Sequence, residues 1–371
     1  NDFKYAGSQN VELEIINETK SFEVNAIDIE IVSASLINED TKVNLNFKYM
    51  KDLERISFTA DKNISVGKYS LKLEFNSTIT NDLKGFYKSQ FLDLNDKEKW
   101  IATTQFEPTS ARNAFPCWDE PEYKAVFSIT LISDEKYLRV SNEKVLKENV
   151  LEDGRVETIF VDSMKMSTYL VAFVIGELEV TEIGNVGETQ IRIIHRPGFS
   201  HQTNFAGIAG MKILEFFENY YQIPYPGSKL DLIAIPDFAM GAMENVGAVT
   251  FREGLLLIDE SKATRQELSR SVSVIAHELA HMWFGDLVTM KWWDGIWLNE
   301  AFASLMEAIA ANGTYPEFKQ WSEMNLSRSA GFSVDSLKNS RPVEFEVETP
   351  EQAEEMFDVL TYEKGSTVLR M

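Results

Sequence analysis

The 371-residue chain contains a single cysteine, Cys117, so it cannot form an internal disulfide. Cys117 stands in the apolar segment 115–118, where a buried small side chain is a simpler interpretation than a catalytic thiol. No apolar run approaches the 18 or so residues that a membrane-spanning helix needs. The sequence therefore predicts no transmembrane segment and is compatible with a reducing, cytoplasmic compartment. A secreted or membrane-tethered parent protein is the alternative.

Positive charge is also scarce, because 36 Lys and Arg stand against 58 Asp and Glu, for a formal net charge of −22. This balance argues against a partner with a phosphate backbone, and we predict no binding to nucleic acid. An acidic protein can attract cationic substrates, although a solvated surface is the simpler explanation. With 44% hydrophobic residues, the chain is long enough to bury a large core and to form two domains.

Two of only four histidines lie in the segment His277-Glu278-Leu279-Ala280-His281. A helix advances about 3.6 residues per turn, so His277 and His281 project from one face and can reach one metal ion. Glu278 is rotated by about 100° from His277 around the helix. This position suits a carboxylate that contacts the metal-bound water and is not itself a ligand. Catalytic zinc takes three protein ligands and leaves one position to water. We therefore predict a zinc metallopeptidase in which Glu278 is the general base.

The third zinc ligand must come from another segment, and Glu300 is the best candidate. Residues 297–306 are typical of a second helix that packs against the first. The alternative for Glu300 is an ordinary helix-surface carboxylate. Its neighbour Asn299 either orients a ligand histidine or caps the helix. Four of the seven tryptophans fall between the two helices, where hydrophobic packing is a simpler role than substrate binding.

The first half of the chain alternates β-branched or aromatic residues with polar ones, which predicts antiparallel sheets with one solvated face. The expected strands are Val11 to Ile15, Phe22 to Val32, Val43 to Tyr49, Tyr69 to Phe75, Phe127 to Ile132, Val156 to Val161, Leu170 to Val180 and Gln190 to Ile194. Arg196-Pro197-Gly198 interrupts this pattern. We place a domain boundary there, with an N-terminal β-sheet domain over residues 1–194 and a second domain over 195–371.

The second half is predicted to be mixed α/β. Apolar residues recur at helical spacing from Phe205 to Tyr221, and Leu230 to Ile235 and Ala248 to Phe251 are typical of strands. A long helix from about Ala263 to Phe284 carries the paired histidines, and Gly285 is a plausible stop.

The chain resembles the zinc aminopeptidase family typified by mammalian aminopeptidase N, because several motifs of that family occur here in the same order. They are Thr104-Gln105-Phe106-Glu107-Pro108, the segment 115–121, the exopeptidase signature Gly241-Ala242-Met243-Glu244-Asn245, the paired histidines with Glu300 after an 18-residue gap, and Tyr362-Glu363-Lys364-Gly365. The resemblance implies a multidomain α+β fold. In it, an N-terminal saddle of antiparallel β-sheet precedes a thermolysin-like catalytic domain, which is expected to be incomplete here.

The resemblance also implies a role for each matching residue. One zinc ion per chain would be held by His277, His281 and Glu300, and Glu278 would activate the water. Glu107 and Glu244 would bind the free α-ammonium group of the substrate, and Tyr362 would donate to the oxyanion. Gly241 and Ala242 would lie along the substrate backbone, and Gln105 would line the pocket for the first side chain.

These roles predict a zinc-dependent aminopeptidase that hydrolyses the N-terminal peptide bond of peptides. Its expected partners are peptides with a free N-terminus and a C-terminal helical region of the parent protein, which would pack on the catalytic domain. One alternative is a zinc endopeptidase or a relative that opens epoxides. The other is a peptide-binding fragment with the same fold and no turnover.

Overall fold

The computed structural model describes residues 3–39 and 41–371. The first part of the chain forms two antiparallel sheets, of four strands in the order β1-β7-β3-β4 and of three in the order β2-β6-β5. The strands are β1 (Lys4–Ile15), β2 (Thr19–Asn25), β3 (Glu30–Asn38), β4 (Thr41–Asn44), β5 (Asn46–Met50), β6 (Arg55–Ile64) and β7 (Gly67–Thr78). Alternate residues of β7 are buried, and the two sheets share one apolar core.

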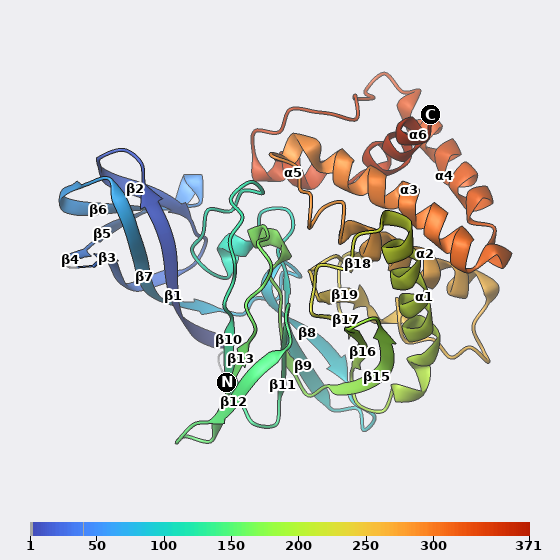
Figure 1. The fold of residues 1–371 in the computed structure, drawn as a ribbon, viewed down its shortest axis with the longest axis horizontal. Coiled ribbons are helices and arrows are strands. Elements are labelled where there is room, and N and C mark those ends of the chain that lie inside the picture. Colours follow the sequence, from blue (N-terminus) through green and yellow to red (C-terminus); the bar gives the residue numbers. More distant parts are fainter. Residues whose placement is uncertain (1–2, 40) are drawn as a thin grey trace.

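Two further antiparallel sheets follow, one of four strands in the order β11-β14-β9-β8 and one of three in the order β10-β13-β12. Their strands are β8 (Gly85–Leu92), β9 (Glu98–Gln105), β10 (Thr130–Asp134), β11 (Leu138–Ser141), β12 (Val145–Val150), β13 (Arg155–Phe160) and β14 (Phe173–Gly176). In Figure 1 these sheets lie between the blue N-terminal sheets and the helical part of the molecule.

Three of the strands expected from the sequence are wrong as single strands. The expected strand from Val43 to Tyr49 is divided at Leu45 into β4 and β5, which lie in different sheets. The expected strand from Phe22 to Val32 is divided after Asn25, and Asp28 adopts a left-handed conformation with φ 52° between β2 and β3. The expected strand from Leu170 to Val180 is divided as well, because a 3-10 turn ends at Leu170 and β14 ends at Gly176. Buried apolar residues in the connections, such as Ala26, Leu45 and Val171, continue the apolar pattern through these breaks, although Asp28 is exposed.

The second part of the chain is built on a mixed five-stranded sheet in the order β15-β16-β17-β19-β18. The strands are β15 (Glu179–Val186), β16 (Thr189–His195), β17 (Lys229–Ile235), β18 (Ala242–Met243) and β19 (Ala248–Arg252). The central pairs β16–β17 and β17–β19 are parallel, and the outer pairs are antiparallel. Every residue of β17 is buried, because one face packs on the helices and the other on the side of the sheet β11-β14-β9-β8.

The α+β fold is confirmed, since these sheets are followed by a helical region (Figure 1). The helices are α1 (Asn204–Tyr221), α2 (Arg265–His281), α3 (Ile296–Thr314), α4 (Gln320–Asp335), α5 (Pro350–Glu355) and α6 (Gly365–Arg370). Among the described residues, none of the helices has the length and apolarity that crossing a membrane requires. The domain boundary near residue 195 stays a prediction; β15 and β16, which precede it, pair into the same sheet as β17.

Candidate active site

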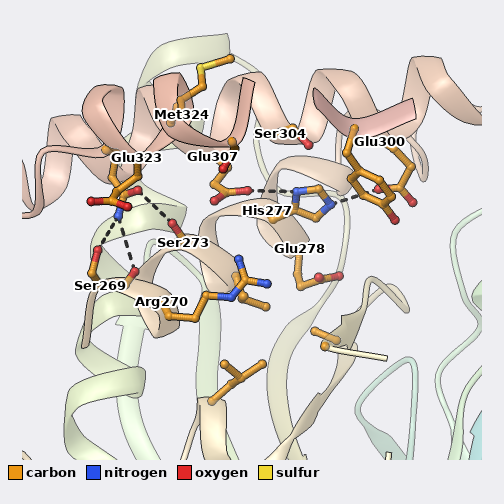
Figure 2. A pocket seen from close by; sticks show the side chains of 18 of the residues that line it. Ser269, Arg270, Ser273, His277, Glu278, Glu300, Ser304, Glu307, Glu323 and Met324 are labelled. Atoms are coloured by element: carbon orange, nitrogen blue, oxygen red, sulfur yellow. Dashed lines mark hydrogen bonds and ion pairs between the residues drawn. The ribbon is translucent and has the colours of Figure 1, made fainter. Parts of the chain in front are cut away.

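The candidate site lies where α2 packs against α3. α2 begins with a capping box, in which Thr264 and Glu267 bond to each other's backbone N–H groups, and it carries the histidines in its last turns. His277 and His281 lie one turn apart on the side that faces Glu300 in the second turn of α3. Figure 2 shows His277 between two carboxylates of α3.

The three predicted zinc ligands converge on one point. The Nε2 atoms of His277 and His281 are 3.1 Å apart. Glu300 Oε2 lies 3.1 Å from the first of these atoms and 3.4 Å from the second. With zinc–ligand bonds of about 2.0–2.1 Å, neighbouring corners of a tetrahedral site are about 3.3 Å apart. The spacing of the three atoms therefore fits a single zinc ion.

The outer nitrogens of both imidazoles explain why the inner ones are free to bind a cation. His277 Nδ1 lies 3.3 Å from Glu307 Oε2, and His281 Nδ1 lies 3.0 Å from the carbonyl oxygen of Phe284. In the neutral imidazoles, donation from each Nδ1 leaves a lone pair on each Nε2 atom. Two such nitrogens and a carboxylate oxygen repel one another unless a cation lies between them.

The charge of the surrounding groups also favours a cation. Burial lowers the pKa of His281, but attraction from Glu244 and Glu300 outweighs burial and raises that pKa to about 10. For Glu300, burial acts in the opposite direction, but His281 and His277 outweigh it and lower the pKa to about 2. The site therefore holds positive charge strongly, as expected of residues that bind a divalent metal.

Glu278 is buried and lines the same cavity, with its side chain directed below His277 in Figure 2. Burial is the main reason that its pKa rises to about 8, with a further contribution from the negative charge of Glu244. The cavity has a volume of about 1370 Å³, larger than the roughly 300–1,000 Å³ of sites for small molecules. It is wide enough for a ligand of several residues.

A second acidic group lies beside the three predicted ligands. One carboxylate oxygen from each of Glu107, Glu244 and Glu300 lies within 4.8 Å of the others. Oε1 of Glu244 is buried, lies 3.8 Å from His281 Nδ1, and has no hydrogen-bond partner in the part of the chain that the structure describes. Burial first, and repulsion between the carboxylates second, raises the pKa of Glu107 well above its usual value. This group can accept hydrogen bonds from a small cation such as an ammonium group.

The predicted backbone-binding segment forms an edge of the central sheet. β18 comprises Ala242 and Met243, pairs with β19 alone among the described strands, and lines the cavity together with Gly241. An edge strand can pair with an extended peptide. Gln105, at the end of β9, donates to the sulfur of Met243 at 3.3 Å and also faces the cavity.

Tyr362 reaches the site from the C-terminal side. It lies in a single π-helical turn, Leu360–Lys364, directly before α6, and its ring centre is 5.9 Å from that of His277. Burial first, and then Glu300, raises the pKa of Tyr362 well above its ordinary value. Its hydroxyl group therefore stays protonated at neutral pH and can act as a donor.

Sequence reasoning did not identify Glu307 or the carbonyl group of Phe284 as partners of the histidines. Glu307 could have been found, because it follows Glu300 by seven residues, or about two helical turns, on the same face of α3. A backbone carbonyl leaves no such signal. Asn299 neither caps α3 nor bonds to a histidine; its side-chain amide donates to the hydroxyl group of Tyr169 at 3.3 Å.

Comparison with known proteins gives two family matches and a set of similar chains. The peptidase M1 N-terminal domain matches residues 1–170, and the peptidase family M1 domain matches residues 205–371. Puromycin-sensitive aminopeptidase of Caenorhabditis elegans is 40% identical over 375 residues, which cover 100% of this chain and 40% of that protein.

Two further relatives are similar over the same region. Endoplasmic reticulum aminopeptidase 2 of Homo sapiens is 41% identical over 382 residues, 99% of this chain and 39% of that protein. Aminopeptidase 2, mitochondrial, of Saccharomyces cerevisiae is 39% identical over 373 residues, 100% of this chain and 39% of that protein. The chain thus spans about two fifths of the length of the curated relatives it matches.

Proposed function

The chain belongs to peptidase family M1, and from this membership we propose that it carries the active site of a zinc-dependent aminopeptidase. The proposed reaction is hydrolysis of the N-terminal peptide bond of a peptide. One observation carries the proposal: the convergent atoms of His277, His281 and Glu300 share a cavity with the acidic group of Glu107 and Glu244. The first set suits a metal and the second suits the free end of a peptide.

We propose that His277, His281 and Glu300 bind the zinc ion. When bound, zinc supplies Lewis acidity and lowers the pKa of a water molecule to about 7. Positive charge beside Glu278 favours its carboxylate form, which then takes the proton from the attacking water. Glu278 returns this proton to the amine that leaves.

The remaining residues position the peptide. Glu107 and Glu244 accept hydrogen bonds from its α-ammonium group, each worth about 1.5–3 kcal/mol when charge-assisted. The edge strand at Gly241 and Ala242 aligns the peptide backbone, and Gln105 contacts the first side chain. Tyr362 donates to the carbonyl oxygen of the scissile bond as negative charge develops there.

The proposal is tested by measuring bound zinc and the release of p-nitroaniline from aminoacyl p-nitroanilides, on this chain and on its longer parent. We expect one zinc ion per chain and release that a chelator abolishes. A peptide with an acetylated N-terminus serves as the control and should resist cleavage. Cleavage of the acetylated peptide would identify an endopeptidase, and tight peptide binding without release would identify a non-catalytic binding protein.

Peptides with a free N-terminus are the proposed partners. A cytoplasmic location and the packing of a further helical region on the second domain stay predictions.

A further inference from the structure

The N-terminal half of the chain contributes a tyrosine to the surroundings of the proposed zinc site. Tyr169 lies in the 3-10 turn Thr168–Leu170, within the region that matches the family's N-terminal domain, and its side chain is only 1% exposed. Its hydroxyl group donates to the carbonyl oxygen of Gly285 at 3.1 Å and accepts from the side-chain amide of Asn299 at 3.3 Å. One hydroxyl group thus connects the loop after α2 with the start of α3.

Each hydrogen-bond partner of Tyr169 is close in the chain to a proposed metal ligand or to a group that holds one. Gly285 follows Phe284, whose carbonyl oxygen lies 3.0 Å from His281 Nδ1. Gly285 also lies directly against the imidazole, since a Cβ atom there would come within 3.1 Å of Nδ1. Asn299 immediately precedes Glu300 on α3. A shift of either partner therefore moves a ligand.

The turn that carries Tyr169 is itself held at both ends. Thr168 donates to Asp119 at 2.7 Å, and the side-chain amide of Asn142 donates to the carbonyl oxygen of Leu170 at 2.7 Å. The ring of Tyr169 packs edge-on against Trp293, with ring centres 5.7 Å apart. None of these contacts involves the hydroxyl group of Tyr169, so removal of that group alone leaves them in place.

We propose that Tyr169 is a positioning residue for the zinc site, through which the N-terminal domain sets the placement of His281 relative to Glu300. Groups that orient metal ligands typically contribute about 10–100-fold to metal affinity. Thr289 also donates to the carbonyl oxygen of Gly285, so that oxygen keeps one partner without Tyr169. The side-chain amide of Asn299 has no second acceptor among the hydrogen bonds of the described residues. Removal of the Tyr169 hydroxyl group should therefore disturb mainly α3, which carries Glu300.

The test is the zinc dissociation constant, measured by competition with a chromogenic chelator, of the wild-type chain and Tyr169→Phe. Tyr87→Phe is the matched control, because Tyr87 is fully buried and its hydroxyl group also donates across the two halves, to the carbonyl oxygen of Asp237 at 3.1 Å. Asp237 does not adjoin a proposed ligand in sequence. We expect Tyr169→Phe to weaken zinc binding by about tenfold or more and Tyr87→Phe by less than about threefold.

Thermal unfolding of the metal-free proteins separates positioning from general stability. The two variants should unfold at similar temperatures without metal. On addition of zinc, the increase in unfolding temperature should be smaller than in the wild type for Tyr169→Phe but not for Tyr87→Phe. Equal zinc affinity of wild type and Tyr169→Phe would overturn the inference, as would equal losses in both variants. Because the inference rests on the proposed zinc site, failure of the wild-type chain to bind zinc would instead refute the proposed function.

Asn299→Ala provides a second route to the same conclusion if Tyr169→Phe does not fold. It removes the other end of the connection and should also weaken zinc binding. If Tyr169→Phe does fold, the two losses should not add in the double variant, because both act through one hydrogen-bonded unit. Additive losses would show that Tyr169 and Asn299 act independently and would contradict the proposal.

Discussion

Glu300 belongs to two groups at once, and this shared membership has a direct chemical consequence. Its carboxylate lies within 3.4 Å of both histidine Nε2 atoms and also completes the acidic group with Glu107 and Glu244. In the proposed function, the metal and the substrate's ammonium group are therefore neighbours. The bond placed over the metal is then the first bond of the peptide.

Glu278→Gln should retain zinc and lose turnover, because an amide cannot accept the proton of the attacking water. We expect a loss of about 10²–10⁴-fold in kcat, the usual contribution of a general base. Metal content and kcat are measured on the same preparation. A variant with normal kcat would remove Glu278 from its proposed role.

Glu244→Ala should weaken binding of free N-termini, because it removes one charge-assisted acceptor of the ammonium group. A loss of about 1.5–3 kcal/mol corresponds to roughly 10–100-fold in affinity. Competition binding compares one peptide in its free and N-acetylated forms. Similar losses for both forms would show that Glu244 does not recognise the terminal amine.

Tyr362→Phe should lower kcat by about 10²–10³-fold, as expected when an oxyanion donor is lost. The ring remains to pack near His277, so zinc content should be unchanged. Steady-state kinetics and metal analysis together test this expectation. Unaltered turnover would place the donor elsewhere.

At the scale of elements, two helices packed against each other carry the proposed metal ligands. α2 begins at a capping box and ends in the histidines, and α3 directs Glu300 and Glu307 toward them from positions about two turns apart. The relative placement of the three proposed ligands and Glu307 thus depends on how α2 and α3 pack. The position of β18, which lines the same cavity, depends on its pairing with β19 at the sheet edge.

Thr264→Ala should destabilise the start of α2, because the N-cap side chain accepts from the backbone N–H of Glu267. We expect a decrease of about 1 kcal/mol in the free energy of unfolding, with zinc affinity unchanged because the cap lies several turns from His277. Denaturant unfolding provides the measurement. Thr264→Ser keeps the hydroxyl group and should stay close to wild type; an equal decrease in both variants would argue against the cap.

At the scale of the whole molecule, the two halves are joined through a shared core. The helix-facing side of β17 contributes Leu230 and Leu232 to the core of the second half, while Ile233 and Ile235 pack with residues of the sheet β11-β14-β9-β8. The proposed zinc site lies beside this junction and is connected to the N-terminal half by Tyr169. Metal binding and folding of the molecule should therefore be coupled.

Removing zinc should lower the thermal stability of the folded chain, because a ligand bound only by the native state stabilises it. At a free zinc concentration of 1,000 times Kd, the stabilisation is about 4 kcal/mol. Calorimetry with and without a chelator measures the effect. Glu300→Ala is the control and should show little response to zinc; a wild-type chain whose unfolding is indifferent to zinc would contradict the expectation.

A sequence pattern predicted the structure well where the residues that form it are close together in the chain. The pair His277 and His281 required only the local period of a helix, and the alternating strand β7 required only the period of two. The break at Asp28 was missed because the flanking residues are apolar. The role of Glu307 beside His277 was missed, although its spacing from Glu300 indicates the same helix face. The role of Phe284 was missed because a backbone carbonyl group has no side-chain signature.

The sequence by itself determined the chemistry available to this protein: two imidazoles at helical spacing, a neighbouring carboxylate, and the motifs that place it in its family. Those features follow from residues close together in the chain. Only the tertiary structure decided that Glu107 and Glu244 meet at Glu300, that β18 lies at a sheet edge, and that Tyr169 reaches the loop beside His281. The physical reason is that contacts between distant segments depend on how the sheets and helices pack, which no local pattern records.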